Sequence, residues 1–292
     1  MSSRPRSTGR CCWGSSWWPW CWSCRRALSA RWAGSSIADP GAAEMSLLLA
    51  QGLRKSFGET RAVNGVDFRV EPEELISLVG SNGAGKTTLV NLLSGLLRPD
   101  AGQIAFDGAD ITALSVGARI RAGIARSFQL VNLFDQLNVL DNVRLAIFSR
   151  DGVTRQPLRL AERDTRARNE AMEILGEFGL ESKWDTPAAG LAQGERKLLD
   201  VAVAYALRPK LILLDEPTSG VGTREKGVIM EAIASVVRER FLAAVIVEHD
   251  MDVVFTYSDR IVMMHQGAVL AEGTPDQIRA DERVSAVLLG KG

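Results

Sequence analysis

The sequence predicts an α/β fold in which a mainly parallel sheet carries helices on both faces. Short apolar runs typical of buried strands alternate along the chain with longer helical segments. One of these runs leads directly into a glycine-rich loop and a helix, and two others stop at acidic residues. No internal repeat and no heptad pattern is evident, so we expect neither a solenoid nor a coiled coil.

The composition fits one large domain or two smaller ones. The chain has 292 residues, 46% of them hydrophobic, and a formal net charge of zero. No apolar run reaches the roughly 18 residues that a membrane span needs. We therefore expect any role at a membrane to depend on a partner.

Residues 1–44 differ in composition from the rest of the chain. They hold all four cysteines, six of the seven tryptophans, and six arginines against two acids, which leaves the remainder mildly acidic. Cys21 and Cys24 have zinc-ligand spacing, but the other two cysteines are adjacent and fit poorly. A signal peptide is a second alternative. The prediction is a disordered extension ahead of a natural start at Met45. The acidic remainder has no basic stripe, which argues against nucleic acid as a partner.

Turn signals divide the first and last parts of the remaining chain into strands. Within residues 47–70, Phe57-Gly58-Glu59 and Asn64-Gly65 predict turns between short strands. Residues 103–108 resemble half a hairpin that ends on Asp-Gly. Gln266-Gly267 predicts the turn of a later hairpin.

A phosphate-binding loop is the most specific signal in the sequence. Residues 80–87 read Gly-Ser-Asn-Gly-Ala-Gly-Lys-Thr and fit the pattern G-x-x-x-x-G-K-[ST]. Backbone N–H groups of such a loop surround phosphate oxygens, Lys86 would reach the β- and γ-phosphates, and Thr87 would bind Mg²⁺. Leu75–Val79 predicts a buried strand before the loop, and residues 86–97 predict a helix whose positive end faces the anion. An ordinary glycine-rich turn is the alternative, and the strand–loop–helix context argues against it.

The middle of the chain is predicted to be largely helical. Gly123–Gln129 reads as a strand that ends on a glutamine, and residues 130–207 follow with helical patterns. Residues 151–157 read as an exposed loop. The segment 163–178 predicts a helix with a one-sided apolar stripe. The stripe consists of Ala167, Ala171, Ile174, Leu175 and Phe178.

Two later strands end on groups that suit phosphate chemistry. Residues 210–214 are an apolar run that stops at Asp215-Glu216, and Ala243–Val247 stops shortly before His249. Carboxylates resist burial without a partner, and an aspartate beside a phosphate loop can hold Mg²⁺ through its water shell. Glu216 would then orient or deprotonate the attacking water, and His249 would donate to the γ-phosphate. Solvated acids at a strand end and a structural histidine are the alternatives.

Together these segments resemble the ATP-binding subunits of ABC transporters, over about residues 46–290. Leu191-Ala192-Gln193-Gly194-Glu195 is similar to the family signature usually written LSGGQ. Gln129 resembles the Q-loop glutamine, which contacts Mg²⁺ and the coupling surface, and His249 resembles the switch histidine. Phe57 resembles the aromatic residue that stacks on adenine. With the phosphate loop, these motifs occur in the family's order.

The resemblance implies a P-loop NTPase domain of RecA-like fold over residues 45–292, with an antiparallel β subdomain and a helical subdomain inserted at about 130–207. Two such subunits would clasp two ATP molecules, each γ-phosphate lying between one phosphate loop and the other subunit's signature helix. The nucleotide-binding residues so implied are Phe57, Gly80, Ser81, Asn82, Gly83, Ala84, Gly85, Lys86, Thr87, Thr88, Leu191, Ala192, Gln193, Gly194 and Glu195. The implied catalytic residues are Lys86, Gln129, Glu216 and His249, and the implied Mg²⁺ ligands are Thr87, Gln129 and Asp215.

Two positions depart from the family pattern. The signature serine is Ala192 here, which removes a hydroxyl contact to the γ-phosphate worth about 1.5–3 kcal/mol. Gly222 stands where an aspartate usually follows the strand that ends at Asp215. We predict that the site completed by this signature is slower than one with the family's serine.

The sequences of residues 123–129, 247–254 and 271–275 are similar to those of LivG-type subunits, which energise importers of branched-chain amino acids. That resemblance implies a LivF-like second ATPase, two membrane permeases and a periplasmic binding protein, at the cytoplasmic face of the inner membrane. Lipopolysaccharide export and the uptake of urea or aromatic acids are the alternatives. ABC ATPases that act on DNA or ribosomes usually carry a coiled-coil insertion or tandem cassettes, which this chain lacks. A nucleotide-binding regulator that does not hydrolyse ATP is a further alternative, and Glu216 argues against it.

Overall fold

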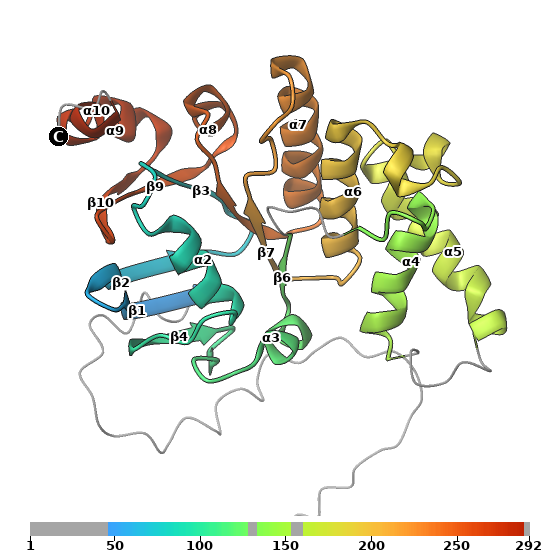
Figure 1. The fold of residues 1–292 in the computed structure, drawn as a ribbon, viewed down its shortest axis with the longest axis horizontal. Helices are drawn as coiled ribbons and strands as arrows, with labels where there is room; N and C mark the ends of the chain where they lie inside the picture. The colour runs from blue at the N-terminus through green and yellow to red at the C-terminus, as the bar shows by residue number, and fades with distance from the viewer. Residues whose placement is uncertain (1–45, 128–132, 153–159, 289–292) are drawn as a thin grey trace, which may run out of the picture. The chain divides into compact units, whose positions relative to one another are not determined.

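Two sheets organise the chain in this computed structural model, which describes residues 46–127, 133–152 and 160–288. One sheet is antiparallel with four strands, and the other has six strands and is mainly parallel, as predicted (Figure 1). The predicted extension over residues 1–44 lies outside the described part. Within that part, no helix is long and apolar enough to cross a bilayer.

The antiparallel sheet has the order β2-β1-β4-β5. Its strands are β1 (Leu48–Phe57), β2 (Thr60–Val70), β4 (Ala101–Phe106) and β5 (Ala109–Asp110). The predicted turn after Phe57 joins β1 to β2, but the turn predicted at Asn64-Gly65 is wrong. Leu53 pairs with Val66 and Arg54 with Asn64, so that Gly65 is the extra residue of a bulge within β2. Gly65 has φ +70°, a conformation that a bulge and a turn can both require of glycine.

The second sheet has the order β10-β9-β3-β8-β7-β6. Its strands are β3 (Leu75–Gly80), β6 (Ile124–Arg126), β7 (Leu211–Asp215), β8 (Ala243–Val247), β9 (Arg260–His265) and β10 (Ala268–Gly273). All neighbours from β9 to β6 are parallel, and β10 is antiparallel to β9. The carboxyl ends of β3, β6, β7 and β8 therefore meet at one edge of the sheet.

Alternation along β7 explains how the two faces of this sheet are covered. Leu213 packs in one core with α2 (Lys86–Ser94) and the antiparallel sheet. Leu214 points the other way, into a core formed with α6 (Gln193–Tyr205) and α7 (Thr223–Glu239). Successive side chains of a strand alternate between faces, so Asp215 emerges on the side of α2.

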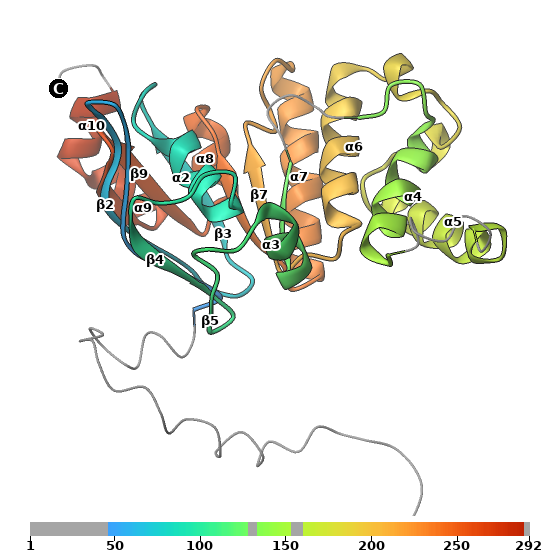
Figure 2. The same cartoon turned by 60° about the horizontal axis from the view of Figure 1, so that its bottom comes forward.

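The helical middle of the chain matches its prediction where it is described. It contains α4 (Val139–Arg150), α5 (Leu160–Glu177), two short 3₁₀ turns, η4 (Glu181–Lys183) and η5 (Ala188–Gly190), and α6. Every residue of the predicted apolar stripe on α5 and just beyond it is buried. Figure 2 shows α7, α6 and α4 following one another away from β7. Of the loop predicted at 151–157, Asp151 and Gly152 form an exposed turn and the rest lies outside the described residues.

The helix that follows the phosphate loop is shorter than predicted. We expected it to extend over residues 86–97, but α2 ends at Ser94 because Gly95 turns left-handed, with φ +82°. Arg119, on α3 (Val116–Ala122), is fully buried and donates to the carbonyls of Leu92 and Leu93 at 2.6 and 2.8 Å. These bonds satisfy carbonyls that the end of a helix leaves unpaired.

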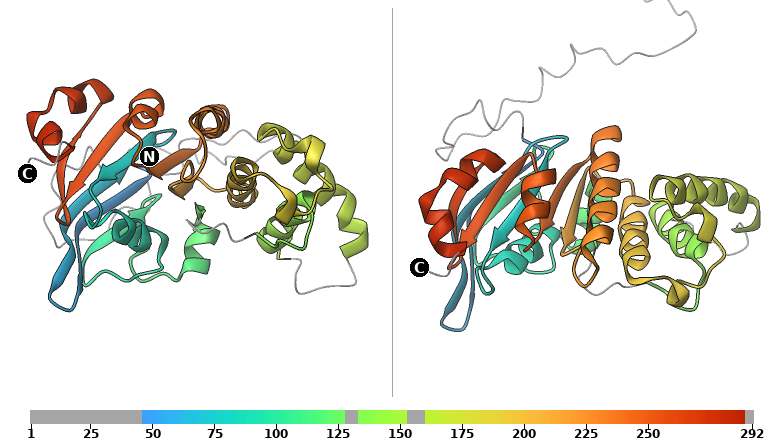
Figure 3. Two further views of the ribbon diagram at one scale, coloured as in Figure 1. Left: turned by 45° about the horizontal axis from the view of Figure 1, so that its top comes forward. Right: turned by 90° about the horizontal axis from the view of Figure 1, so that it is seen from above.

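Three short helices follow β8 in the described part of the chain. They are α8 (Met251–Tyr257), α9 (Pro275–Ala280) and α10 (Glu282–Leu288). Figure 3 shows α9 and α10 beside β9 and β10, and these elements share a small apolar core.

Candidate active site

The phosphate loop has a backbone that only glycine permits at two of its positions. Gly80 and Gly85 have φ +148° and +100°. A Cβ on Gly80 would lie 2.2 Å from the carbonyl oxygen of Met264, and one on Gly85 would lie 2.2 Å from that of Ala62. Gly83 has φ +80° but open space around it. The glycines thus let the loop curl tightly against two neighbouring backbones.

A hairpin turn braces the loop from the side. The amide of Gly267, in the predicted turn between β9 and β10, donates to the carbonyl of Ala84 at 3.0 Å. The carbonyl of Gly267 accepts from the amide of Asn64 at 2.8 Å. The β2 bulge and this turn together fix one wall of the loop, so the misplaced turn signal at Asn64-Gly65 marks a structural support of the site.

The start of α2 offers an anion-binding end. The helix begins at Lys86, its N-cap Gly85 makes no side-chain cap, and its first turn is Lys86-Thr87-Thr88, without an acid. Helix-end N–H groups and the helix dipole favour a negative charge there. Thr87 is exposed at this end and Thr88 is half-buried.

Lys86 closes over its own loop. The ammonium donates to the carbonyls of Gly80 and Ser81 at 2.8 and 3.0 Å. Burial lowers the pKa of Lys86, and the carboxylates of Glu216 and Asp215 raise it in part. The ammonium is therefore hydrogen-bonded, but nearby carboxylates offset only part of the cost of burying its positive charge. The negative charge of a phosphate would offset more of that cost.

Asp215 lies at the end of β7 with one oxygen bonded and one not. Arg126, at the end of β6, donates from Nη2 to Asp215 Oδ2 at 3.0 Å, and both side chains are buried. Asp215 Oδ1 is buried and has no hydrogen-bond partner among the described residues. An unpaired buried carboxylate oxygen is costly unless something else binds it.

Glu216 and His249, each of which follows the end of a strand, contact one another. His249 Nε2 lies 2.9 Å from Glu216 Oε1, between the ends of β8 and β7. Glu216 has φ +51°, an uncommon conformation for a residue with a side chain, of the kind that clusters at functional sites. Its amide donates to Val247 at 3.0 Å and its carbonyl accepts from Lys197 at 3.2 Å, which hold it in place.

A buried glutamate ties together the loops that carry these two residues. Glu248 Oε1 accepts from the amide and the hydroxyl of Thr218, at 3.0 and 2.8 Å. Glu248 Oε2 accepts from the amide of His249 at 3.3 Å. The contact between Glu216 and His249 therefore rests on a hydrogen-bonded support rather than on two free loops.

The signature segment lies at the start of α6 and is exposed at two of its five residues. Ala192 is the N-cap residue, and its amide donates to Glu195 Oε2 at 3.0 Å. Lys183 pairs with the other oxygen of Glu195. Leu191 is buried, Ala192 and Gln193 are exposed, and Gly194 is buried with Glu225 beside it.

The structure does not bring the signature to the phosphate loop of the same chain. Among the described residues, no hydrogen bond or ion pair joins residues 191–195 to residues 80–88. Phe57 lies at the end of β1 with an exposed ring, and the Lys55 ammonium lies 5.9 Å from its centroid. Gln129, predicted as a ligand and catalytic residue, lies outside the described residues.

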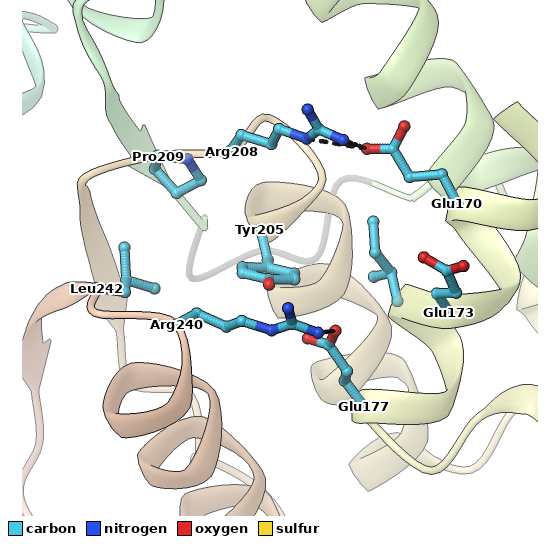
Figure 4. A pocket seen from close by; sticks show the side chains of 9 residues that line it. Glu170, Glu173, Glu177, Tyr205, Arg208, Pro209, Arg240 and Leu242 are labelled. Atoms are coloured by element: carbon cyan, nitrogen blue, oxygen red, sulfur yellow. Dashed lines mark hydrogen bonds and ion pairs between the residues drawn. The ribbon is translucent and has the colours of Figure 1, made fainter. Parts of the chain in front are cut away.

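A cavity of about 340 Å³ lies away from these residues, between α5, the end of α6 and the end of α7 (Figure 4). Glu170 and Glu177 point from α5 toward Arg208 and Arg240 on its rim, and burial raises the pKa of Tyr205 between them to about 12. None of the predicted site residues lines it. The phosphate loop and the strand ends therefore remain the candidate site.

Sequence reasoning missed the residues that support this site. Arg126, Lys197 and Glu248 all make contacts to a predicted residue or its loop. An arginine inside an apolar strand, as at Arg126, is the one signal that could have been noticed, because such a charge is buried only with a partner.

Known proteins match the chain across the cassette described above. A profile of the ABC transporter family matches residues 63–219, more than half of the chain. BraF of Pseudomonas aeruginosa, a high-affinity branched-chain amino acid transport ATP-binding protein, is 36% identical over 84% of this chain and 98% of its own length. LivG of Escherichia coli K12, which carries the same description, is 35% identical with the same coverage. LptB of Escherichia coli K12, a lipopolysaccharide export ATP-binding protein, is 36% identical over 85% of this chain and 98% of its own.

Solved structures share the fold. The ADP conformation of MJ1267, an ATP-binding cassette of an ABC transporter, matches with a TM-score of 0.73 and 28% identity, over 84% of this chain and 99% of that one. A dimeric post-hydrolysis state of the cassette MJ0796, bound to ADP and phosphate, matches with a TM-score of 0.67 and 25% identity, over 78% and 98%. A cassette of this fold thus binds ADP and forms dimers. The chain belongs to the ABC transporter family, as an ATP-binding subunit whose ATP hydrolysis is coupled to transport.

Proposed function

We propose that the predicted site residues act as their positions suggest, beginning with residues 80–88 as the cradle of the ATP phosphates. The loop curvature, the open start of α2 and the partly compensated Lys86 support this assignment. Phe57 would stack on adenine, and its exposed ring at the end of β1 supports that role. The single observation that carries the proposal is the Glu216–His249 contact at the carboxyl ends of β7 and β8, on the sheet edge where β3 leads into this loop.

The oxygen donors fit Mg²⁺. Thr87 is exposed at the start of α2, and Asp215 Oδ1 is a buried carboxylate oxygen without a partner among the described residues. Such oxygens suit a hard cation that keeps several waters. Gln129 is proposed as a further ligand on its resemblance alone. Bound Mg²⁺ would neutralise charge that develops on the phosphate oxygens.

Glu216 is proposed as the general base or orienter of the attacking water, and His249 as a donor to the γ-phosphate. The 2.9 Å contact between them and their support through Glu248 favour this pairing of roles. Lys86 would stabilise the charge on the transferred phosphoryl group. Gln129 is proposed as the fourth catalytic residue.

The signature residues 191–195 are proposed to bind the γ-phosphate held by a second subunit. The exposure of Ala192 and Gln193 at the start of α6 and the lack of a described bond to the chain's own phosphate loop support this arrangement. We further propose a cassette over residues 45–292, with a helical subdomain at about 130–207.

For the cargo, we propose branched-chain or other hydrophobic amino acids, taken up at the cytoplasmic face of the inner membrane. Identity of 34–36% over 98% of the length of BraF and several LivG proteins supports this. The implied partners are a LivF-like ATPase, two permeases and a periplasmic binding protein. The second candidate is lipopolysaccharide export, because LptB is as similar to this chain as LivG is. Uptake of urea or aromatic acids is a further alternative.

Reconstitution tests the two candidates. The chain would be isolated from its native membrane together with the permeases bound to it and placed in proteoliposomes. The periplasmic binding protein encoded by a neighbouring gene would then be added. We expect leucine-loaded binding protein to stimulate ATP hydrolysis and leucine entry, both abolished by Glu216→Gln. Stimulation by lipopolysaccharide instead, with copurification of an export permease, would refute the import assignment.

A further inference from the structure

Arg126 is a buried arginine that joins three elements around the candidate site. It ends β6, and only 8% of its side chain is exposed. Its Nη1 donates to Asn91 Oδ1 at 2.5 Å and to Ser94 Oγ at 3.2 Å, both on α2. Its Nη2 donates to Asp215 Oδ2 at 3.0 Å, at the end of β7. One guanidinium thus links the helix that begins with Lys86 to the carboxylate proposed to face the metal.

The arrangement leaves the two oxygens of Asp215 in different states. Oδ2 is held by Arg126, whereas Oδ1 is buried and has no partner among the described residues. A carboxylate held at one oxygen by a rigid fork cannot rotate without breaking that bond, so the direction of the other oxygen is fixed.

We propose that Arg126 is a positioning residue for the metal-binding carboxylate. By holding Asp215 Oδ2, it turns Oδ1 toward the Mg²⁺ of the bound nucleotide and keeps α2 and β7 in register around it. The inference rests on the proposed assignment of Asp215 to the metal site. Partners that orient a ligand in this way typically change metal affinity by about 10–100-fold when they are removed.

The fork of arginine is what this role requires. Nη1 bonds to α2 while Nη2 bonds to β7, so the planar group spans two elements with separate donors. A lysine has one ammonium on a flexible stem and cannot hold both partners in one plane. Charge alone would therefore not replace Arg126.

The chain provides a matched control in Arg119. It is also buried and also donates to α2, through the carbonyls of Leu92 and Leu93. No described bond joins it to Asp215. Loss of Arg119 therefore reports the structural cost of removing a buried arginine from this helix.

The test measures metal binding rather than turnover. Full-length protein saturated with ADP is titrated with Mn²⁺, and free Mn²⁺ is followed by electron paramagnetic resonance; ADP affinity is measured separately in EDTA. We expect Arg126→Gln and Arg126→Lys each to weaken Mn²⁺ binding by about tenfold or more. ADP affinity in EDTA should stay within about twofold of the parent, as should Mn²⁺ affinity in Arg119→Lys.

Each other outcome overturns the inference at a definite point. Mn²⁺ affinity that is unchanged in Arg126→Gln, or restored in Arg126→Lys, refutes positioning by the fork. Should Arg126→Gln fail to fold, Asn91→Ala, which removes one anchor of the same guanidinium, must weaken Mn²⁺ binding or the inference falls. Asp215→Asn separates the two proposals. If Asp215→Asn leaves Mn²⁺ affinity unchanged, the assignment of Asp215 to the metal site fails as well. If Asp215→Asn weakens Mn²⁺ binding but the Arg126 variants do not, only the role of Arg126 fails.

Discussion

Replacing Ala192 with serine should have two separable effects, one on the chain alone and one on the paired site. Ala192 is the N-cap residue of α6, with φ −62° and ψ 158°, the extended conformation of a cap. Glu195 Oε2 already accepts from its amide, which is half of a capping box. A serine hydroxyl would supply the other half by accepting from the amide of Glu195. We therefore expect Ala192→Ser to raise the free energy of unfolding by about 1 kcal/mol.

The same hydroxyl can also donate a hydrogen bond, because its O–H group donates while its oxygen accepts. Directed at a γ-phosphate, that bond is worth about 1.5–3 kcal/mol, or about 10- to 150-fold in the rate of single-turnover hydrolysis if it strengthens in the transition state. Urea unfolding of the nucleotide-free chain measures the first effect. Rapid quenching with saturating ATP and the full complement of subunits measures the second.

Ala192→Gly separates the two effects. Glycine is a better N-cap than alanine but has no hydroxyl, so it should recover much of the stability and none of the rate. A serine variant with the expected stability and no rate gain would refute the assignment of this position to the phosphate. A glycine variant as fast as the serine variant would refute it as well.

Four further substitutions test separate parts of the site and fold. Lys86→Ala is expected to weaken ATP binding in calorimetry by at least about tenfold, since a charged hydrogen bond is lost; parent-like binding and hydrolysis would refute the phosphate-loop assignment. Gly80→Ala should lower the urea-unfolding free energy by about 1–3 kcal/mol, because its Cβ would lie 2.2 Å from a backbone oxygen, and unchanged stability would contradict this geometry. Glu216→Gln should keep ATP binding but slow phosphate release by about 10²–10⁴-fold; unchanged turnover would exclude the general base. The bonds of Arg150 hold the pKa of Glu170 below its ordinary value, so their stabilisation is present at neutral pH and is lost as pH falls through the lowered folded pKa. Glu170→Gln should therefore cost about 1–2 kcal/mol at pH 7 and little in acid, and a cost independent of pH would contradict the ion pair.

The strands and the phosphate loop could be predicted because local patterns determine them. Residues 75–80 and 243–247 are apolar runs of strand length, and they are buried strands in the structure. The apolar stripe on α5 likewise needs only its own helical period. The bulge at Asn64-Gly65 could not be separated from a turn, because glycine at positive φ serves both and pairing with β1 decides between them.

The pairing of polar groups could not be predicted, because the partners are distant in sequence. Arg126 and Asp215 are 89 positions apart, and nothing in either local pattern names the other. The contact between Glu216 and His249 was not predicted, because the sequence shows only that each residue follows an apolar run. Their common support through Glu248 depends on how two loops close, which no periodicity encodes.

Several polar groups of the site are hydrogen-bonded within the protein itself, and this bears on how turnover would begin. Lys86 donates to carbonyls of its own loop, and Glu216 contacts His249. A phosphate that enters the cradle must exchange these contacts for its own, so its advantage comes from charge and not from the number of bonds. Under the roles proposed above, a γ-phosphate would draw His249 to itself and leave Glu216 Oε1 able to accept from water. The release of Glu216 would then depend on the γ-phosphate, because ADP has no γ-phosphate to accept a hydrogen bond from His249.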